Sequence, residues 1–109
     1  NTAAEIADGI VAIIDKLQLK LPDSKILLLS IFPRGERPND LRTILANASE
    51  TAAARIASRD KVVYMDITAN FLNNNGILNP AIMPDALHPS EQGYRIWAES
   101  IEPVVSELF

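Results

Sequence analysis

The sequence predicts a parallel α/β sheet with helices on both faces. Segments with helical periodicity alternate with short apolar segments along the chain. The longest apolar segment, residues 25–32, shows no alternation of polar and apolar side chains, which is typical of a strand buried on both faces of a parallel sheet. Strands that alternate with helices also favour right-handed crossovers between parallel strands.

The first helix is expected over residues 2–20. Thr2 and Glu5 have the spacing of a capping box, and apolar residues recur at helical spacing after them. That stripe consists of Ile6, Ile10, Ile13, Ile14 and Leu17. Pro22 and Asp23 are expected to end the helix. The strand over 25–32 follows, and Pro33–Pro38 is predicted to be a loop.

Asn39 or Asp40 is predicted to cap the second helix. Its expected buried stripe comprises Leu41, Ile44, Leu45, Ala48, Ala52 and Ile56. Val62–Asp66 is predicted to be the second strand, and Asp66 is expected to cap the segment that follows it. Phe71 and Leu72 fit a helical turn, and the run Asn73–Gly76 is a turn signal.

Ser90 is predicted to cap a final helix after a loop over 84–89. The apolar positions of this helix are Tyr94, Trp97, Ile101, Val104, Val105 and Leu108, of which the two aromatic residues are expected to pack in the core. Gly93 is expected to allow a close approach, and Pro103 to kink or restart the helix.

Two strands are too few for a stable sheet, and neither suits an edge. We therefore expect residues 1–109 to form the C-terminal part of a larger α/β domain. The missing strands would lie upstream in the same chain or on a second chain.

Composition narrows the possible functions. The 14 acidic and 10 basic residues give a charge of −4 with no basic run, which argues against a nucleic-acid-binding protein. The chain has no cysteine and one histidine, so neither a thiolate nucleophile nor a metal site is expected. No apolar run is long enough to span a membrane. The sequence does not predict a cellular compartment.

Asp85 and His88 form the strongest candidate for chemistry. Neutral imidazole suits a general base, and a carboxylate on its Nδ1–H orients the ring and stabilises the imidazolium. An Asp-x-x-His pair in a turn can bring both side chains to one place. The spacing alone also fits a solvated pair that caps the loop.

The loop over 33–38 offers smaller candidates. Arg34, Glu36 and Arg37 follow the carboxyl end of a predicted strand, where ligands of α/β proteins usually bind. Arg34 is the residue we expect to contact substrate. The alternative interpretation of these charged residues is a solvated loop with internal ion pairs. The glycosylation pattern at Asn47–Ser49 falls in a predicted helix and is treated as chance.

The block Asp85–Tyr94, read as Asp-Ala-Leu-His-Pro-Ser-Glu-Gln-Gly-Tyr, resembles the last sequence block of the SGNH (GDSL-type) esterases and acylhydrolases. Leu27–Glu36 and Pro38–Arg42 are similar to the branch that contains the catalytic subunits of platelet-activating-factor acetylhydrolase. The resemblance implies a three-layer αβα, flavodoxin-like sheet. It also implies a serine esterase without a cofactor, in which His88 is the base and Asp85 orients it.

The Gly-Asp-Ser block of that family is absent, and so are the blocks that carry its oxyanion glycine and asparagine. None of the serines here fits a strand–turn–helix elbow. We therefore expect an N-terminal half, on the same or a second chain, to supply the nucleophile, and this chain alone to be inert. The substrate implied is a short acyl ester, such as an acetyl ester of a carbohydrate or lipid. A non-catalytic α/β binding or partner domain, or a pseudoenzyme, remains the alternative.

Overall fold

The computed structural model describes residues 2–108 and contains three long helices and two strands within that range. In chain order the elements are α1 (Ala3–Lys20), β1 (Ile26–Leu29), α2 (Asp40–Ile56), β2 (Val62–Met65), the 3₁₀ turn η1 (Thr68–Phe71) and α3 (Glu91–Leu108). The two strands pair in parallel, with Ile26 opposite Val62 and Leu29 opposite Met65. The predicted parallel α/β arrangement is confirmed.

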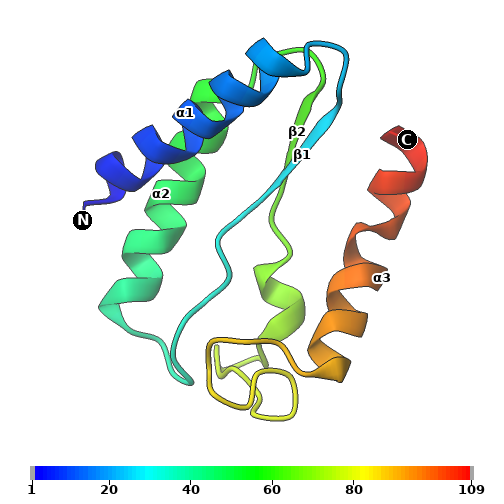
Figure 1. Cartoon of the computed structure of the whole chain (residues 1–109). Coiled ribbons are helices and arrows are strands. Elements are labelled where there is room, and N and C mark those ends of the chain that lie inside the picture. The colour runs from blue at the N-terminus through cyan, green and yellow to red at the C-terminus, as the bar shows by residue number, and fades with distance from the viewer. Residues whose placement is uncertain (1, 109) are drawn as a thin grey trace.

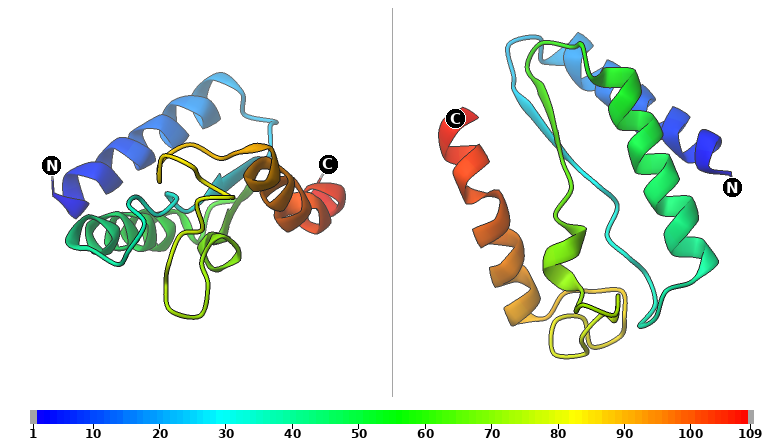
Figure 2. Two further views of the ribbon diagram at one scale, coloured as in Figure 1. Left: turned by 90° about the horizontal axis from the view of Figure 1, so that it is seen from below. Right: turned by 180° about the vertical axis from the view of Figure 1, so that it is seen from behind.

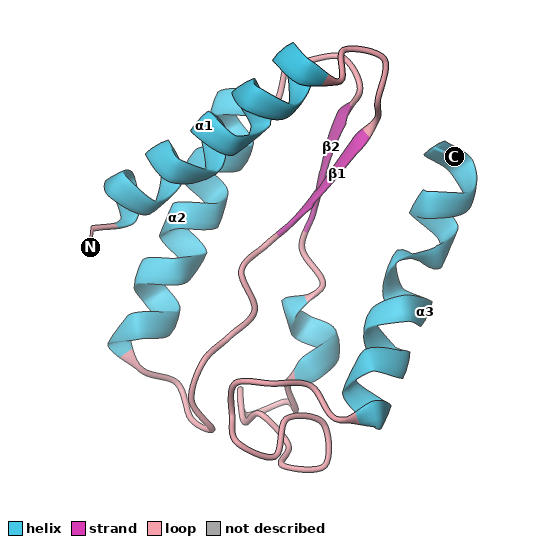
Figure 3. Cartoon of the chain, in the orientation of Figure 1, coloured by secondary structure: helices cyan, strands magenta, loops and turns pink. Residues whose placement is uncertain are grey.

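The helices form layers on the two sides of the strands. Helices α1 and α2 lie together on one side, and α3 lies on the other (Figures 1 and 2). Both strands run toward the end of the molecule where the long loops gather (Figure 3). Segments that follow β1 and β2 are therefore brought together at one end, as parallel pairing requires.

Two separate clusters of apolar side chains form the core. The first lies between α1, α2 and the strands, and its buried members are Ala7, Val11, Ile14, Ala52 and Ile56. The second lies beneath α3 and the loops, and its buried members are Ile67, Phe71, Leu78, Ile82 and Met83. Phe32 after β1 and Trp97 of α3 pack against this second cluster. The loop end of the molecule therefore has a core of its own.

The predicted helix starts are confirmed by their hydrogen bonds. The backbone N–H of Glu5 donates to Thr2 Oγ1 at 3.1 Å, while the Thr2 N–H donates to Glu5 Oε1 at 3.0 Å. Asn39, rather than Asp40, caps α2, because its Oδ1 accepts from the N–H of the third helical residue. Ser90 Oγ accepts from the N–H of Gly93 at 3.2 Å at the start of α3.

Several expectations about length and burial are wrong. The strands have four residues each instead of eight and five, so Ser30 lies just beyond β1. Leu41 is 44% exposed and Tyr94 is 55% exposed, although both were expected in buried stripes. A sheet of two strands is narrower than the helices that cover it, so outer positions of each stripe remain in solvent. Helix α3 also continues through Pro103 to Leu108 without a restart.

Between residues 2 and 108, none of the helices combines the length and the apolar character needed to cross a bilayer.

Candidate active site

Asp85 and His88 lie together in the loop that precedes α3. The Nδ1 atom of His88 is 2.6 Å from Asp85 Oδ2. The other carboxylate oxygen, Oδ1, accepts from the backbone N–H groups of Leu87 at 2.9 Å and of His88 at 2.7 Å. One carboxylate therefore fixes both the imidazole ring and the backbone that carries it.

These hydrogen bonds keep the carboxyl group of Asp85 ionised. The bond from the His88 side chain, followed by the bond from its backbone N–H, holds the pKa of Asp85 well below its usual range. An ionised carboxylate only accepts hydrogen bonds, so Nδ1 of His88 must be the donor. In a neutral ring with its proton on Nδ1, the lone pair of Nε2 can accept a proton, and the ring is exposed enough to meet a reactant, with 74% of the side chain accessible.

The loop over residues 84–89, the histidine loop, is held at both ends by hydrogen bonds. Ser90 donates from Oγ to the carbonyl of Ala81 at 2.6 Å and from its N–H to that of Ile82 at 2.7 Å. Earlier in the loop, the N–H of Ala86 donates to the carbonyl of Met83 at 2.9 Å, and Ala86 has a φ of 59°. This left-handed turn directly follows Asp85.

The absence of a side chain at Gly93 lets α3 approach this loop. A Cβ there would lie 2.4 Å from the carbonyl oxygen of Ile82 and 2.9 Å from Cβ of Pro89. The close approach predicted for Gly93 is therefore confirmed, and it seats the helix directly on the loop.

The loop over 33–38 lies against the histidine loop. The N–H of Gly35 donates to the carbonyl of Ala86 at 3.1 Å, and the N–H of Leu78 donates to that of Glu36 at 2.8 Å. Sequence reasoning missed Arg42, whose guanidinium binds several carbonyls of this loop. An arginine at the start of a helix gave no signal, because its partners depend on the folded path of the loop.

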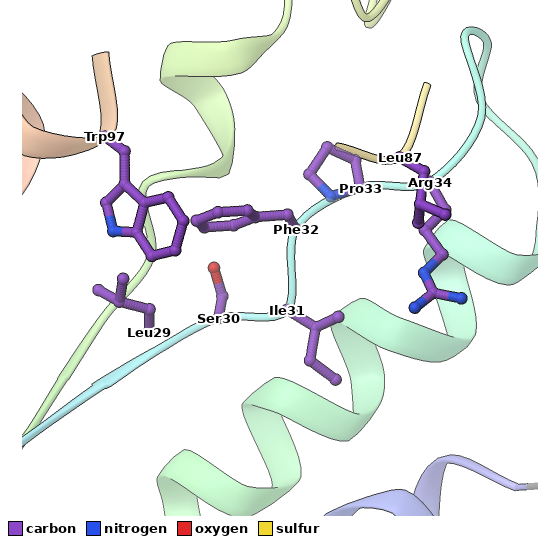
Figure 4. A pocket seen from close by; sticks show the side chains of 8 residues that line it. All are labelled: Leu29, Ser30, Ile31, Phe32, Pro33, Arg34, Leu87 and Trp97. Carbon is purple, nitrogen blue, oxygen red and sulfur yellow. The ribbon is translucent and has the colours of Figure 1, made fainter. Parts of the chain in front are cut away.

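A cavity of about 300 Å³ opens beside the histidine loop (Figure 4). Its lining residues are Leu29, Ser30, Ile31, Phe32, Pro33, Arg34, Leu87 and Trp97. The rings of Phe32 and Trp97 meet edge to face at 4.8 Å between centroids. Arg34 lines this cavity, and no ion pair within residues 2–108 involves it, Glu36 or Arg37. Leu87, which directly precedes His88 in the chain, is the residue of this loop that lines the cavity.

Ser30 and Asp66 join the carboxyl ends of the two strands. Ser30, which is 6% exposed, donates from Oγ to Asp66 Oδ1 at 2.7 Å. The same carboxylate oxygen accepts from the N–H of Thr68 at 2.9 Å, so Asp66 binds the first residue of η1, although Ile67 and not Asp66 occupies the N-cap position. Burial raises the pKa of Asp66, but the hydrogen bonds from Thr68 and Ser30 outweigh it and lower the pKa. The Ser30 hydroxyl is thus committed to a structural bond.

Among residues 2–108, no three histidine, aspartate or glutamate side chains come together as a metal site would require.

Comparisons with known proteins agree with this fold. The model of the GDSL-like Lipase/Acylhydrolase family matches residues 1–96. The chain is 32% identical over 108 residues to platelet-activating factor acetylhydrolase IB subunit alpha2 of Rattus norvegicus, covering 99% of this chain and 47% of the relative. It is 30% identical over 94 residues to the alpha1 subunit of Homo sapiens, covering 86% of this chain and 41% of the relative.

A solved structure is also similar. It comes from Streptococcus pneumonia, and its description names platelet activating factor. The match has a TM-score of 0.78 at 22% identity and covers 98% of this chain and 52% of the other. The likeness supports the three-layer fold. The chain spans about half the length of the curated relatives it matches.

Proposed function

Because the chain belongs to the GDSL-like lipase/acylhydrolase family, we propose that it carries the histidine and aspartate of a serine ester hydrolase. The observation that carries this proposal is the 2.6 Å contact between His88 Nδ1 and Asp85 Oδ2. In the reaction, Nε2 of His88 removes the proton of a serine hydroxyl as the serine attacks the ester carbonyl. His88 then gives a proton to the leaving alcohol, while Asp85 stabilises the imidazolium.

We propose that residues 1–109 are the C-terminal part of one hydrolase domain. The serine and the oxyanion donors would come from an N-terminal half, on the same or a second chain. The length of the relatives supports this, since the chain spans about half of them. The half-buried strands also support it, as do the exposed apolar side chains of Ile13 and Leu17 on α1 and of Leu21 just after it. A further layer of chain would cover these surfaces.

We propose a short acyl ester, such as an acetyl ester of a lipid or carbohydrate, as the substrate. The relatives are named as acetylhydrolases, which supports this choice. The cavity beside Leu87 is mostly apolar at the end that holds Phe32 and Trp97, and it has a guanidinium at Arg34. Arg34 would contact a polar or anionic group of the substrate.

The test uses the full-length protein that contains this chain, with p-nitrophenyl acetate, butyrate and octanoate as substrates. We expect wild-type protein to prefer the acetate ester and to be labelled by an organophosphonate at a serine. His88→Gln should lose hydrolysis by roughly a thousandfold or more, with Asp85→Asn also strongly impaired.

Asp23→Asn serves as the control, because that exposed carboxylate pairs with Lys61 and lies away from the site. It should leave the rates unchanged. Hydrolysis and labelling that survive His88→Gln would show that His88 is not the base. A wild-type protein that neither hydrolyses the esters nor reacts with the phosphonate would favour a non-catalytic partner domain or a pseudoenzyme.

A further inference from the structure

We infer that Arg42 is a positioning residue for His88, because its guanidinium holds the loop over 33–38 against the loop that carries Asp85 and His88. The inference rests on the proposed function, since that function gives the histidine a reaction to serve. Arg42 lies in the first turn of α2 and reaches the site only through other residues.

The guanidinium of Arg42 donates hydrogen bonds to four backbone carbonyls. Its Nη2 donates to the carbonyl oxygens of Gly35 at 2.6 Å and Glu36 at 3.1 Å. Its Nε donates to that of Arg34 at 3.4 Å, and its Nη1 donates to that of Gly76 in the neighbouring turn. Burial of the group lowers the pKa of Arg42. The bonds to Gly35 and Gly76 are partly buried, which makes them stronger than exposed ones.

The path of the loop depends on this donor. Gly35 has a φ of 85°, a left-handed conformation that helps turn neighbouring carbonyls toward one point. Asn39 Nδ2 supports the same path by donating to the carbonyls of Arg34 at 2.9 Å and Arg37 at 2.8 Å. A planar fork with five N–H groups can serve several acceptors at once, whereas a lysine ammonium presents three donors from a single point.

A hydrogen bond connects the loop over 33–38 to the loop that carries His88. The N–H of Gly35 donates to the carbonyl of Ala86 at 3.1 Å. Ala86 lies between the aspartate and histidine of the pair and has the left-handed φ noted above. A shift of Gly35 therefore moves the backbone that sets the contact between Asp85 and His88.

A second arginine on α2 provides a matched control. Arg55 lies in the last turn of the helix and pairs with the exposed Asp8 at 2.6 Å. Its removal takes the same guanidinium from the same helix but touches neither loop of the site.

The experiment compares Arg42→Lys, Arg42→Ala and Arg55→Ala in the full-length protein. We expect kcat for p-nitrophenyl acetate to fall by roughly tenfold to a hundredfold in Arg42→Ala, with a smaller change in KM. Arg42→Lys should recover part of the loss. Arg55→Ala should match wild type.

A second readout reports the histidine directly. The ¹⁵N shifts of the His88 ring, assigned by their loss in His88→Gln, show which nitrogen carries the proton. In the Arg42 variants the form protonated at Nδ1 should become less populated, and amide exchange at Gly35 should become faster. Because the lysine variant keeps the charge and much of the side chain, these measurements remain available if Arg42→Ala does not fold.

The two proposals fail in different ways. A folded Arg42→Lys variant with unchanged kcat, ring ¹⁵N shifts and Gly35 exchange would overturn the positioning role, whatever His88→Gln does. If wild-type protein does not hydrolyse esters, the proposed function fails. A change in the His88 ring shifts in the Arg42 variants alone would then still support the positioning role.

Discussion

The exchange Gly93→Ala tests how closely α3 is seated on the histidine loop. The added methyl group would lie 2.4 Å from the carbonyl oxygen of Ile82, about 1 Å closer than ordinary contact. That oxygen cannot withdraw freely, because it accepts the N–H of Ser90 at 2.7 Å. On the other side, Cβ of Pro89 would lie only 2.9 Å away. Helix and loop must therefore separate.

The cost can be worked out from these contacts. Overpacking of this kind costs about 1–3 kcal/mol. Weakening the bond between Ser90 and Ile82 adds about 1 kcal/mol. The higher helix propensity of alanine offsets about 1 kcal/mol of this loss in stability. We therefore expect the free energy of unfolding to fall by about 1–3 kcal/mol in Gly93→Ala.

Gly9→Ala provides the matched control, because a Cβ at Gly9 in α1 would meet nothing within 4 Å. That variant should be more stable than wild type by about 0.5–1 kcal/mol. Urea titrations of the full-length protein, followed by circular dichroism, measure both changes. If Gly93→Ala is stabilised as much as Gly9→Ala, the close approach of α3 to the loop is refuted.

Three further predictions concern single side chains. Asp85→Asn removes a carboxylate whose pKa is lowered on folding. Its contribution to stability is therefore present above about pH 4 and is lost as the pH falls toward the folded-state pKa. Urea titrations at pH 7 and pH 2.5 should show a difference in unfolding free energy between variant and wild type that narrows in acid, and a constant difference would contradict this. Phe71→Ala, at a site 1% exposed, should cost about 3–5 kcal/mol, whereas Leu19→Ala, at a site 81% exposed, should change stability by less than about 0.5 kcal/mol in the same assay. Ala86→Gly relieves the strain of a left-handed φ of 59° and should raise the unfolding free energy by about 1 kcal/mol. The thermal midpoint should rise with it, and a lower midpoint would contradict the presence of backbone strain at Ala86.

Local signals in the sequence predicted much of the fold. The capping box at Thr2 and Glu5 and the cap at Asn39 act over three residues, so their spacing alone indicates where helices begin. The proximity of Asp85 and His88 could be predicted for the same reason, because both lie in one turn.

Features set by long-range packing could not be predicted. The contact of Gly35 with Ala86 joins residues about fifty positions apart, and the carbonyls that bind Arg42 converge only in the folded loop. The exposure of Tyr94 depends on the width of the sheet, which no helical periodicity reports. Instead of entering the core, that ring stacks on Trp97 at 5.8 Å between centroids.

The two apolar clusters have a consequence for the order in which the molecule folds and opens. The buried residues of the second cluster all lie between positions 67 and 83, close together along the chain. Contacts between neighbours in sequence form quickly, because little loop-closure entropy opposes them. The first cluster must join α1 to the far end of α2, from Ala7 to Ile56. Amide exchange should therefore resolve two cooperative units, with the histidine loop in the one whose buried residues lie close together in sequence.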